Sequence, residues 1–133
     1  STLDLSFVSL YHDQIINVGA EIINVLLTPG HYYDSLCFWH QSDKLIFTGD
    51  TMFIGRTGRV ISSRSNIADL YNSIYNILLK LPHETQILSG HHYGYKLFDS
   101  ISNNINSSSF FQCDSLKSFK IVMEKYEKNR KKS

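Results

Sequence analysis

Residues 45–51 read Leu-Ile-Phe-Thr-Gly-Asp-Thr, an apolar strand followed directly by a glycine turn and a carboxylate. Two other stretches repeat this design with an imidazole in place of the carboxylate, Thr-Pro-Gly-His at 28–31 and Ser-Gly-His-His-Tyr at 89–93. Glycine permits a sharp turn, and strands that end at one edge of a sheet bring the side chains of such turns together. The three stretches therefore predict an α/β sheet with a ligand site at one edge.

The side chains that this site would offer are His31, Asp50 and His91. Two imidazoles and one carboxylate suit Zn²⁺, Fe²⁺ or Mn²⁺. Each residue alone is a weak signal, because a histidine after a glycine is more often structural and a turn aspartate usually bonds its own backbone. His92 competes with its neighbour, and alternation lets only one of the two point inward. The remaining histidines lack this setting and are expected to be structural or exposed: His12, His40 and His83.

Apolar and β-branched runs around these turns predict the strands. The run at 21–27 is interpreted as a buried strand, and 35–41 with 44–48 as a hairpin. A stretch without clear period, at 49–64, holds three arginines and three glycines, which predicts a long functional loop. Shorter extended pieces are expected at 5–10, 15–18 and 86–89.

Two amphipathic helices are expected, because apolar side chains recur at spacings of three and four over 66–81 and 114–128. The polar stretch at 97–109 predicts one or two helical turns. The expected caps and stop are Ser65 and Pro82 for the first helix, and Asp114 or Ser115 for the second.

Composition limits the class of protein. The 133 residues are 42% hydrophobic and 19% charged, which predicts a single folded domain over 1–133, with 113–133 as a C-terminal helix and basic tail. Two cysteines exclude a disulfide-stapled scaffold, and Cys37 in an apolar strand is expected to be a buried, inert thiol. No apolar run reaches about 18 residues, so no membrane span is expected. Unpaired cysteines and the lack of a signal-peptide pattern indicate a cytoplasmic protein.

Charge is unevenly distributed along the chain. Residues 1–116 hold 6 Lys and Arg against 10 Asp and Glu, whereas 117–133 hold 7 against 2. Such a tail could contact nucleic acid or an anionic surface. Glu124 and Glu127 interleave with the basic residues at helical spacing, which favours a solvated helix, so nucleic acid is not an expected partner.

The ordered set TPGH, LIFTGDTMF, GRTGR, a helix, LP and GHHYG resembles the metallo-β-lactamase superfamily over roughly residues 13–100. The wording is most similar to the branch of glyoxalase II (hydroxyacylglutathione hydrolase) and persulfide dioxygenase. This resemblance implies an αββα sandwich, of which the chain would form the C-terminal half, a mixed sheet with flanking helices. Two sheets face each other in that fold, so the chain's sheet would keep one bare apolar face. The hypothesis is a fragment, a truncated gene product, or self-association through that face.

The resemblance also implies roles for single residues. His31 matches a histidine ligand of a first metal, and His91 matches a ligand of a second. Asp50 matches the aspartate that bridges two metals, or the sole carboxylate on one iron, which makes it the expected catalytic residue. The residues matched to substrate contacts and to the glycine-arginine loop beside the site are Tyr93, Arg56 and Arg59.

The chain departs from the family pattern in three places. The H-x-H-x-D-H motif, which supplies about half of the ligands, does not occur in the sequence. Val60 and Ile61 replace polar residues of the loop, and His92 replaces an acidic residue after the ligand histidine.

Three functions are therefore expected. The first is glyoxalase II-like, zinc-dependent hydrolysis of a small thioester, such as a glutathione thioester, with metal coordination incomplete in this chain. A mononuclear iron persulfide dioxygenase is the second. A non-catalytic remnant or interaction module is the third.

Overall fold

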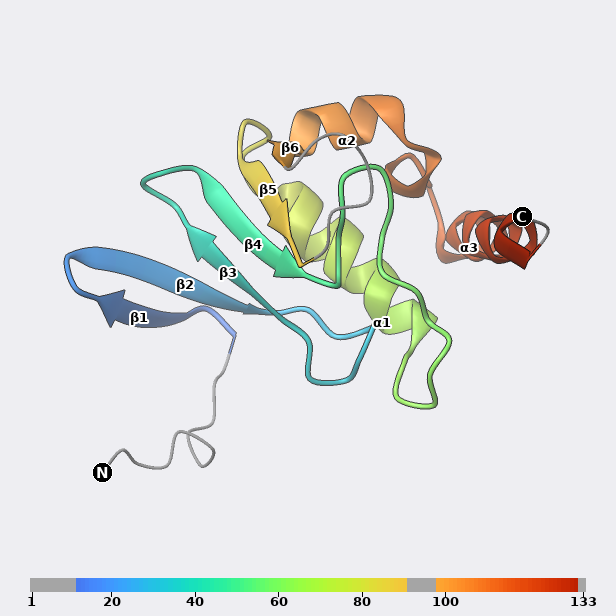
Figure 1. Ribbon diagram of the computed structural model, residues 1–133, viewed down its shortest axis with the longest axis horizontal. Helices are drawn as coiled ribbons and strands as arrows, with labels where there is room; N and C mark the ends of the chain where they lie inside the picture. Colours follow the sequence, from blue (N-terminus) through green and yellow to red (C-terminus); the bar gives the residue numbers. More distant parts are fainter. Residues whose placement is uncertain (1–11, 91–97, 132–133) are drawn as a thin grey trace.

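The computed structural model describes residues 12–90 and 98–131 (Figure 1). The predicted strand at 5–10 lies outside the described residues, as do His91, His92 and Tyr93. Among the residues that are described, no helix is long and apolar enough to cross a membrane.

The strands form one mixed sheet of six, and their order in space follows their order in the chain. Neighbouring strands pair antiparallel, except β4 and β5, which run parallel. The hairpin of β3 and β4 confirms the prediction for this part of the chain. The bounds are β1 Gln14–Val18, β2 Glu21–Leu27, β3 Leu36–His40, β4 Leu45–Gly49, β5 Gln86–Ser89 and β6 Phe98–Ser100.

This topology brings the glycine turns together. Strands β2, β4 and β5 run in the same direction, because two antiparallel steps separate β2 from β4 and β5 is parallel to β4. The three strands end at one edge of the sheet, where their arrowheads converge in Figure 1. The turns at 28–31, 49–51 and 89–90 follow these ends, which confirms the predicted common edge.

Helices cover one face of the sheet, and the hydrophobic core lies between the helices and the sheet. Leu26, Cys37, Ile46 and Ile87 are at most 3% exposed and belong to one apolar cluster with the helices. Burial of these side chains is the main stabilising contribution to the fold. The helical segments are α1 Ile67–Asn72, η2 Ser73–Ile77, η3 Leu78–Lys80, α2 Ile101–Ser107, η4 Ser109–Phe111 and α3 Leu116–Lys131.

The expected helix at 66–81 is a continuous helical run over 67–80, in which α1 passes into a π-helical turn and then a 3₁₀ turn. The predicted cap, Ser65, is wrong. Asn66 caps the helix, because its Oδ1 accepts the backbone N–H of Asp69 at 2.9 Å. The Ser65 hydroxyl instead donates to the carbonyl oxygen of His31 at 2.5 Å and ties the helix start to the first glycine turn.

The C-terminal part follows the prediction with one addition. Helix α2 accounts for the expected helical turns at 97–109, but the short strand β6 before it was not expected. Ser115 directly precedes α3, and its Oγ accepts the backbone N–H of Ser118 at 3.1 Å. Between the two candidate caps, Ser115 therefore makes the capping bond.

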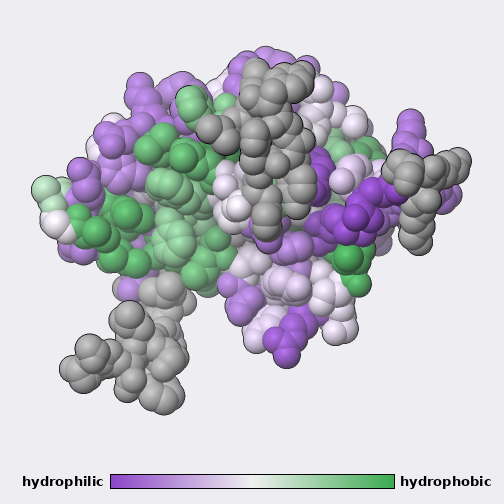
Figure 2. Space-filling view, in the orientation of Figure 1, coloured by the Kyte–Doolittle hydropathy of each residue, from purple (hydrophilic) through white to green (hydrophobic). Residues whose placement is uncertain are grey.

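The other face of the sheet carries an apolar row. Val25, Phe38, Phe47, Leu88 and Phe98 are register partners across β2 to β6. Phe47 is 40% exposed and Phe98 is 57% exposed, so described residues do not fully cover the row. Figure 2 shows hydrophobic side chains gathered over the strands on this view of the molecule. Self-association through this face stays a prediction of the sequence.

Gly30 joins the sheet edge to the helix layer. Its φ is +143°, and a Cβ at this position would lie 2.3 Å from the Cα of Leu70. Its carbonyl oxygen also accepts the N–H of Asn66 at 2.8 Å. Only glycine lets the turn before His31 pack directly on α1.

We expect Gly30→Ala to lower the free energy of unfolding by about 3 kcal/mol or more, because the new methyl group would overlap backbone atoms of α1. Gly19→Ala is the matched control, since Gly19 also has a positive φ but nothing within 4 Å of its Cβ position. The control should lose about 1–2 kcal/mol from backbone strain alone. Urea denaturation of both variants tests this, and equal losses would contradict it.

Candidate metal centre

His31 and Asp50 meet at the edge where β2, β4 and β5 end. The Nε2 atom of His31 lies 3.8 Å from Oδ2 of Asp50. The imidazole side chain is 21% exposed and the carboxylate 39% exposed, so both face solvent from a partly enclosed position. Two of the three predicted ligands are therefore side by side, and His91 lies outside the described residues.

The tautomer of His31 follows from its other nitrogen. Nδ1 lies 2.7 Å from the backbone carbonyl oxygen of Arg59. A carbonyl oxygen can only accept, so Nδ1 carries the proton and donates it. In the neutral ring the lone pair is then on Nε2, the atom nearer Asp50. A metal-ligating histidine is commonly oriented by such a bond from its second nitrogen.

The distance between the two side chains fits one divalent ion. Zinc-ligand bonds are about 2.0–2.2 Å long, so two ligands of one ion lie at most about 4.2 Å apart. The observed 3.8 Å is within this limit and is too long for a hydrogen bond between the pair. The residues present therefore fit a metal ion.

Two glycines shape the space around Asp50. A Cβ at Gly58 would lie 1.9 Å from the carbonyl oxygen of Asp50 and 3.1 Å from Nδ1 of His31. A Cβ at Gly90 would lie 2.8 Å from Oδ1 of Asp50. The backbone can therefore pack this closely on Asp50 only with glycine at positions 58 and 90.

Two of the three arginines in the loop after Asp50, Arg56 and Arg59, lie at this site and have partners within the chain. Arg59 forms a bidentate pair with Glu127, with Nε and Nη2 donating to its carboxylate oxygens at 2.7 and 2.9 Å. The Arg56 guanidinium lies over the rings of Phe53 and Tyr126, at 4.7 and 5.2 Å from their centroids. Substrate contact by either arginine stays a prediction.

A pocket of about 180 Å³ opens beside His31 and Asp50. This volume suits the reacting end of a small substrate rather than the whole of a large one. Its wall combines aromatic and aliphatic groups with hydroxyls and guanidinium groups, from Tyr32, Phe53, Arg56, Arg59, Ile61, Ser62 and Ser65.

A buried thiol lies next to the threonines that flank the site. The Cys37 Sγ is 3.2 Å from Oγ1 of Thr28, and that hydroxyl is 3.5 Å from Oγ1 of Thr51. Burial raises the pKa of the Cys37 thiol to about 12, more than hydrogen bonds from the two threonines lower it. The expected burial of Cys37 is confirmed, and its inertness stays a prediction.

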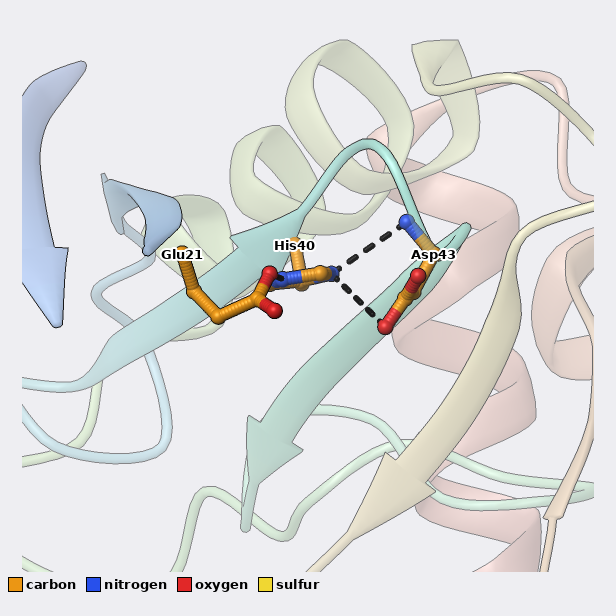
Figure 3. Close-up of side chains that lie close together, drawn as sticks. All are labelled: Glu21, His40 and Asp43. Atoms are coloured by element: carbon orange, nitrogen blue, oxygen red, sulfur yellow. Dashed lines mark hydrogen bonds and ion pairs between the residues drawn. The ribbon is translucent and has the colours of Figure 1, made fainter. Parts of the chain in front are cut away.

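A second group of side chains of metal-ligating type lies at the end of β3 that is remote from His31 and Asp50. Glu21, His40 and Asp43 offer atoms within 4.8 Å of one another (Figure 3). The Nδ1 atom of His40 accepts the backbone N–H of Asp43 at 3.2 Å. Its Nε2 therefore carries the proton, which it donates to Glu21 at 2.5 Å. Both ring nitrogens are used, so this buried histidine is structural, as expected from the sequence.

Comparison with known proteins identifies the family of this chain. The profile of the family described as "Metallo-beta-lactamase superfamily" matches residues 4–91, more than half of the chain. The chain belongs to the metallo-β-lactamase superfamily. The common edge at which β2, β4 and β5 end is accordingly the edge where the sequence resemblance places the family's metal ligands.

Relatives of this chain carry different names. A hydroxyacylglutathione hydrolase of Methylobacterium nodulans is 39% identical over 79 residues, 59% of this chain and 30% of that protein. BaeB of Bacillus velezensis, a probable polyketide biosynthesis zinc-dependent hydrolase, is 30% identical over 126 residues, 95% of this chain and 54% of that protein. The crystal structure of ETHE1 from Myxococcus xanthus is similar with a TM-score of 0.81 and 31% identity, covering 88% of this chain and 51% of that one. The chain thus spans about a third to a half of these relatives.

Sequence reasoning missed the contribution of α3 to this site. Glu127 was assigned to a solvated face, whereas its carboxylate is only 25% exposed and holds Arg59. A signal was present, because Glu127 follows Met123 by four residues and so shares the apolar stripe of the helix.

We expect Gly58→Ala to weaken zinc binding by about tenfold or more, because the new methyl group would displace both Asp50 and His31. Gly55→Ala is the control in the same loop, since its φ of +93° adds backbone strain but a Cβ there would meet nothing within 4 Å. Competition with a chromophoric chelator measures the dissociation constant. Equal affinities of Gly58→Ala and Gly55→Ala would contradict this account of the loop.

Cys37 should resist alkylation in the folded chain, because its thiol is fully buried and protonated through pH 9. Cys113 is partly exposed and provides an internal control. Mass spectrometry after iodoacetamide treatment should find Cys113 modified much faster, and both modified in denaturant. Comparable rates in the folded protein would contradict the prediction.

Proposed function

We propose that this chain supplies part of the metal centre and substrate pocket of a glyoxalase II-like hydrolase that cleaves small thioesters. The observation that carries the proposal is the 3.8 Å approach of His31 Nε2 to Asp50 Oδ2, with the histidine held in the ligand tautomer by the Arg59 carbonyl. The hydroxyacylglutathione hydrolase and the zinc-dependent hydrolase among the relatives support this reaction class.

His31 and Asp50 would hold the metal, with His91 as the third ligand expected from the sequence. A bound Zn²⁺ would make water a hydroxide source near neutral pH and polarise a substrate carbonyl. These three residues are about half of the ligand set that the resemblance implies. This chain would therefore supply one half of the metal ligands, and an H-x-H-x-D-H motif would supply the other half.

The chain's own residues would orient the reactants. The Arg59 carbonyl keeps the proton on Nδ1 of His31, so that Nε2 stays a ligand atom. The Asp50 carboxylate would hold the metal in place at the sheet edge. The rings of Tyr32 and Phe53 and the aliphatic Ile61 line the pocket and would shield the reacting carbonyl from bulk water.

Substrate contacts belong to the same proposal. Tyr93 is proposed to contact a glutathione-type thioester, as the resemblance implies. The Arg56 and Arg59 side chains line the pocket and are proposed to contact the substrate. The Arg56 guanidinium would suit a substrate carboxylate, whereas the charge of Arg59 is paired with Glu127. Their bonds within the chain fix where each charge sits.

A second candidate is a mononuclear iron dioxygenase that oxidises a persulfide. The similarity to ETHE1 over 88% of this chain favours it, because the sequence resemblance includes the persulfide dioxygenase branch. One imidazole and one carboxylate with a further histidine also suit Fe²⁺. The two reactions differ in their second substrate, which is water in the first and O₂ in the second.

Both candidate functions require a metal ion at His31 and Asp50, so metal binding by the purified chain tests this common requirement. We expect about one Zn²⁺ per chain by calorimetric titration, and a loss of at least tenfold in affinity for Asp50→Asn. Asp43→Asn is the matched control, because Asp43 belongs to the group around His40 and should leave affinity unchanged. Binding that Asp50→Asn does not weaken would overturn the assignment of the site.

Turnover separates the two reactions. Loss of S-lactoylglutathione in the presence of Zn²⁺ supports the hydrolase, and oxygen consumption with glutathione persulfide and Fe²⁺ supports the dioxygenase. The assay uses the chain alone and the chain mixed with a polypeptide that carries the H-x-H-x-D-H half of a superfamily relative. Absence of both activities in the mixture, with metal bound, would favour the non-catalytic alternative.

A further inference from the structure

Helix α3 contacts the arginine loop with three side chains of one face. Met123, Tyr126 and Glu127 are spaced at i, i+3 and i+4, which places them together on a helix. The Thr57 hydroxyl lies 3.4 Å from the sulfur of Met123, Arg56 stacks on Tyr126, and Arg59 pairs with Glu127. The last turns of the chain's final helix therefore pack against consecutive parts of the loop beside Asp50.

The pair of Arg59 and Glu127 is the most directional of these contacts. Its two parallel hydrogen bonds of 2.7 and 2.9 Å fix both the position and the plane of the guanidinium group. Both side chains are about a quarter exposed, so the pair is better shielded from water and salt than an ordinary surface pair. It links residues that are 68 positions apart in the sequence.

Arg59 also touches the metal ligand through its backbone. Its carbonyl oxygen accepts the Nδ1 proton of His31 at 2.7 Å. Rotation of the peptide group after Arg59 would turn this oxygen away from the ring. An anchored Arg59 side chain restricts that rotation, because the same residue is then held at two points.

We propose that Glu127 is a positioning residue for the metal centre: by anchoring Arg59, it keeps the Arg59 carbonyl on His31 and so keeps the Nε2 lone pair facing Asp50. The effect on metal affinity rests on the proposed function, but the effect on the His31 tautomer does not. The assignment also gives α3 a place in the site that neither the motifs nor the relatives' names indicate.

A purely structural ion pair would behave differently. Its loss would lower the stability of α3 packing and leave the ring of His31 unchanged. The positioning role instead predicts a change in which nitrogen of His31 carries the proton. The tautomer of His31 is therefore the deciding observation, and stability alone is not.

The experiment compares Glu127→Ala, Glu127→Gln and Glu124→Ala in the full chain. Glu124 is exposed on the same helix and provides the matched control. The ring ¹⁵N shifts of His31 in the metal-free protein give the ratio of the Nδ1–H to the Nε2–H tautomer. We expect this ratio to fall at least about threefold in Glu127→Ala, less in Glu127→Gln, and not in Glu124→Ala.

Zinc titration of the same variants is the second readout. Loss of a group that orients a ligand histidine commonly weakens binding by about 10–100-fold, so loss of its anchor should weaken it by about five- to tenfold. Arg59→Ala should reproduce the effect of Glu127→Ala, and the double variant should be no worse than either. Should Glu127→Ala fail to fold, Glu127→Gln, which keeps the side-chain volume, carries both measurements.

An unchanged tautomer ratio in a folded Glu127 variant would overturn the proposal. A changed ratio in a chain that binds no zinc would uphold the positioning of His31 while the proposed function fails. A changed ratio together with weaker zinc binding supports both.

Discussion

The candidate site depends on one steric constraint, the absence of a side chain at Gly58. A Cβ there would overlap the Asp50 carbonyl oxygen and press on the His31 ring. The loop closes over this gap, and the Gly58 N–H donates to the carbonyl oxygen of Thr51 at 2.9 Å. Closure brings the next residue, Arg59, against His31. The orientation of the His31 side chain thus depends on close backbone packing at Gly58, which brings the Arg59 carbonyl within reach of its ring.

The closed loop also packs against one face of α3, so the two faces of this helix differ. Its inner face presents Met123, Tyr126 and Glu127 to the loop. Its opposite face carries exposed basic residues: Lys117, Lys125 and Lys128. The two acidic residues of α3, Glu124 and Glu127, therefore have different surroundings. Glu124 is exposed, whereas the Glu127 side chain is only 25% exposed, and its pair with Arg59 offsets the cost of removing its charge from water.

The parts of this fold that follow local rules could be predicted, and those set by distant partners could not. Local sequence explains the strand at 21–27, the hairpin at 36–49 and the shared edge of β2, β4 and β5. The prediction that 21–27 is buried holds only for its second half, since Ile22 is 55% exposed on the outer hairpin of the sheet. The strand β6 is three residues of mixed polarity and exists because β5 offers an edge. Serine and asparagine are both common N-cap residues, so the sequence does not favour Asn66 over Ser65. The Ser65 hydroxyl donates to the carbonyl oxygen of His31, 34 residues away in the sequence. Glu127 depends on a partner 68 residues away.

Residue type alone does not distinguish the surroundings of His40 from those of His31, since each histidine lies beside a carboxylate. Around His40 the Asp43 N–H takes the lone pair of one ring nitrogen, and Glu21 takes the proton of the other. A metal would have to displace one of these bonds, and the buried ring would lose a partner. Around His31 the backbone takes only the proton, and the remaining lone pair lies toward Asp50 beyond hydrogen-bonding distance. A backbone carbonyl, which cannot donate, is therefore what makes this histidine a candidate ligand and the other a structural one.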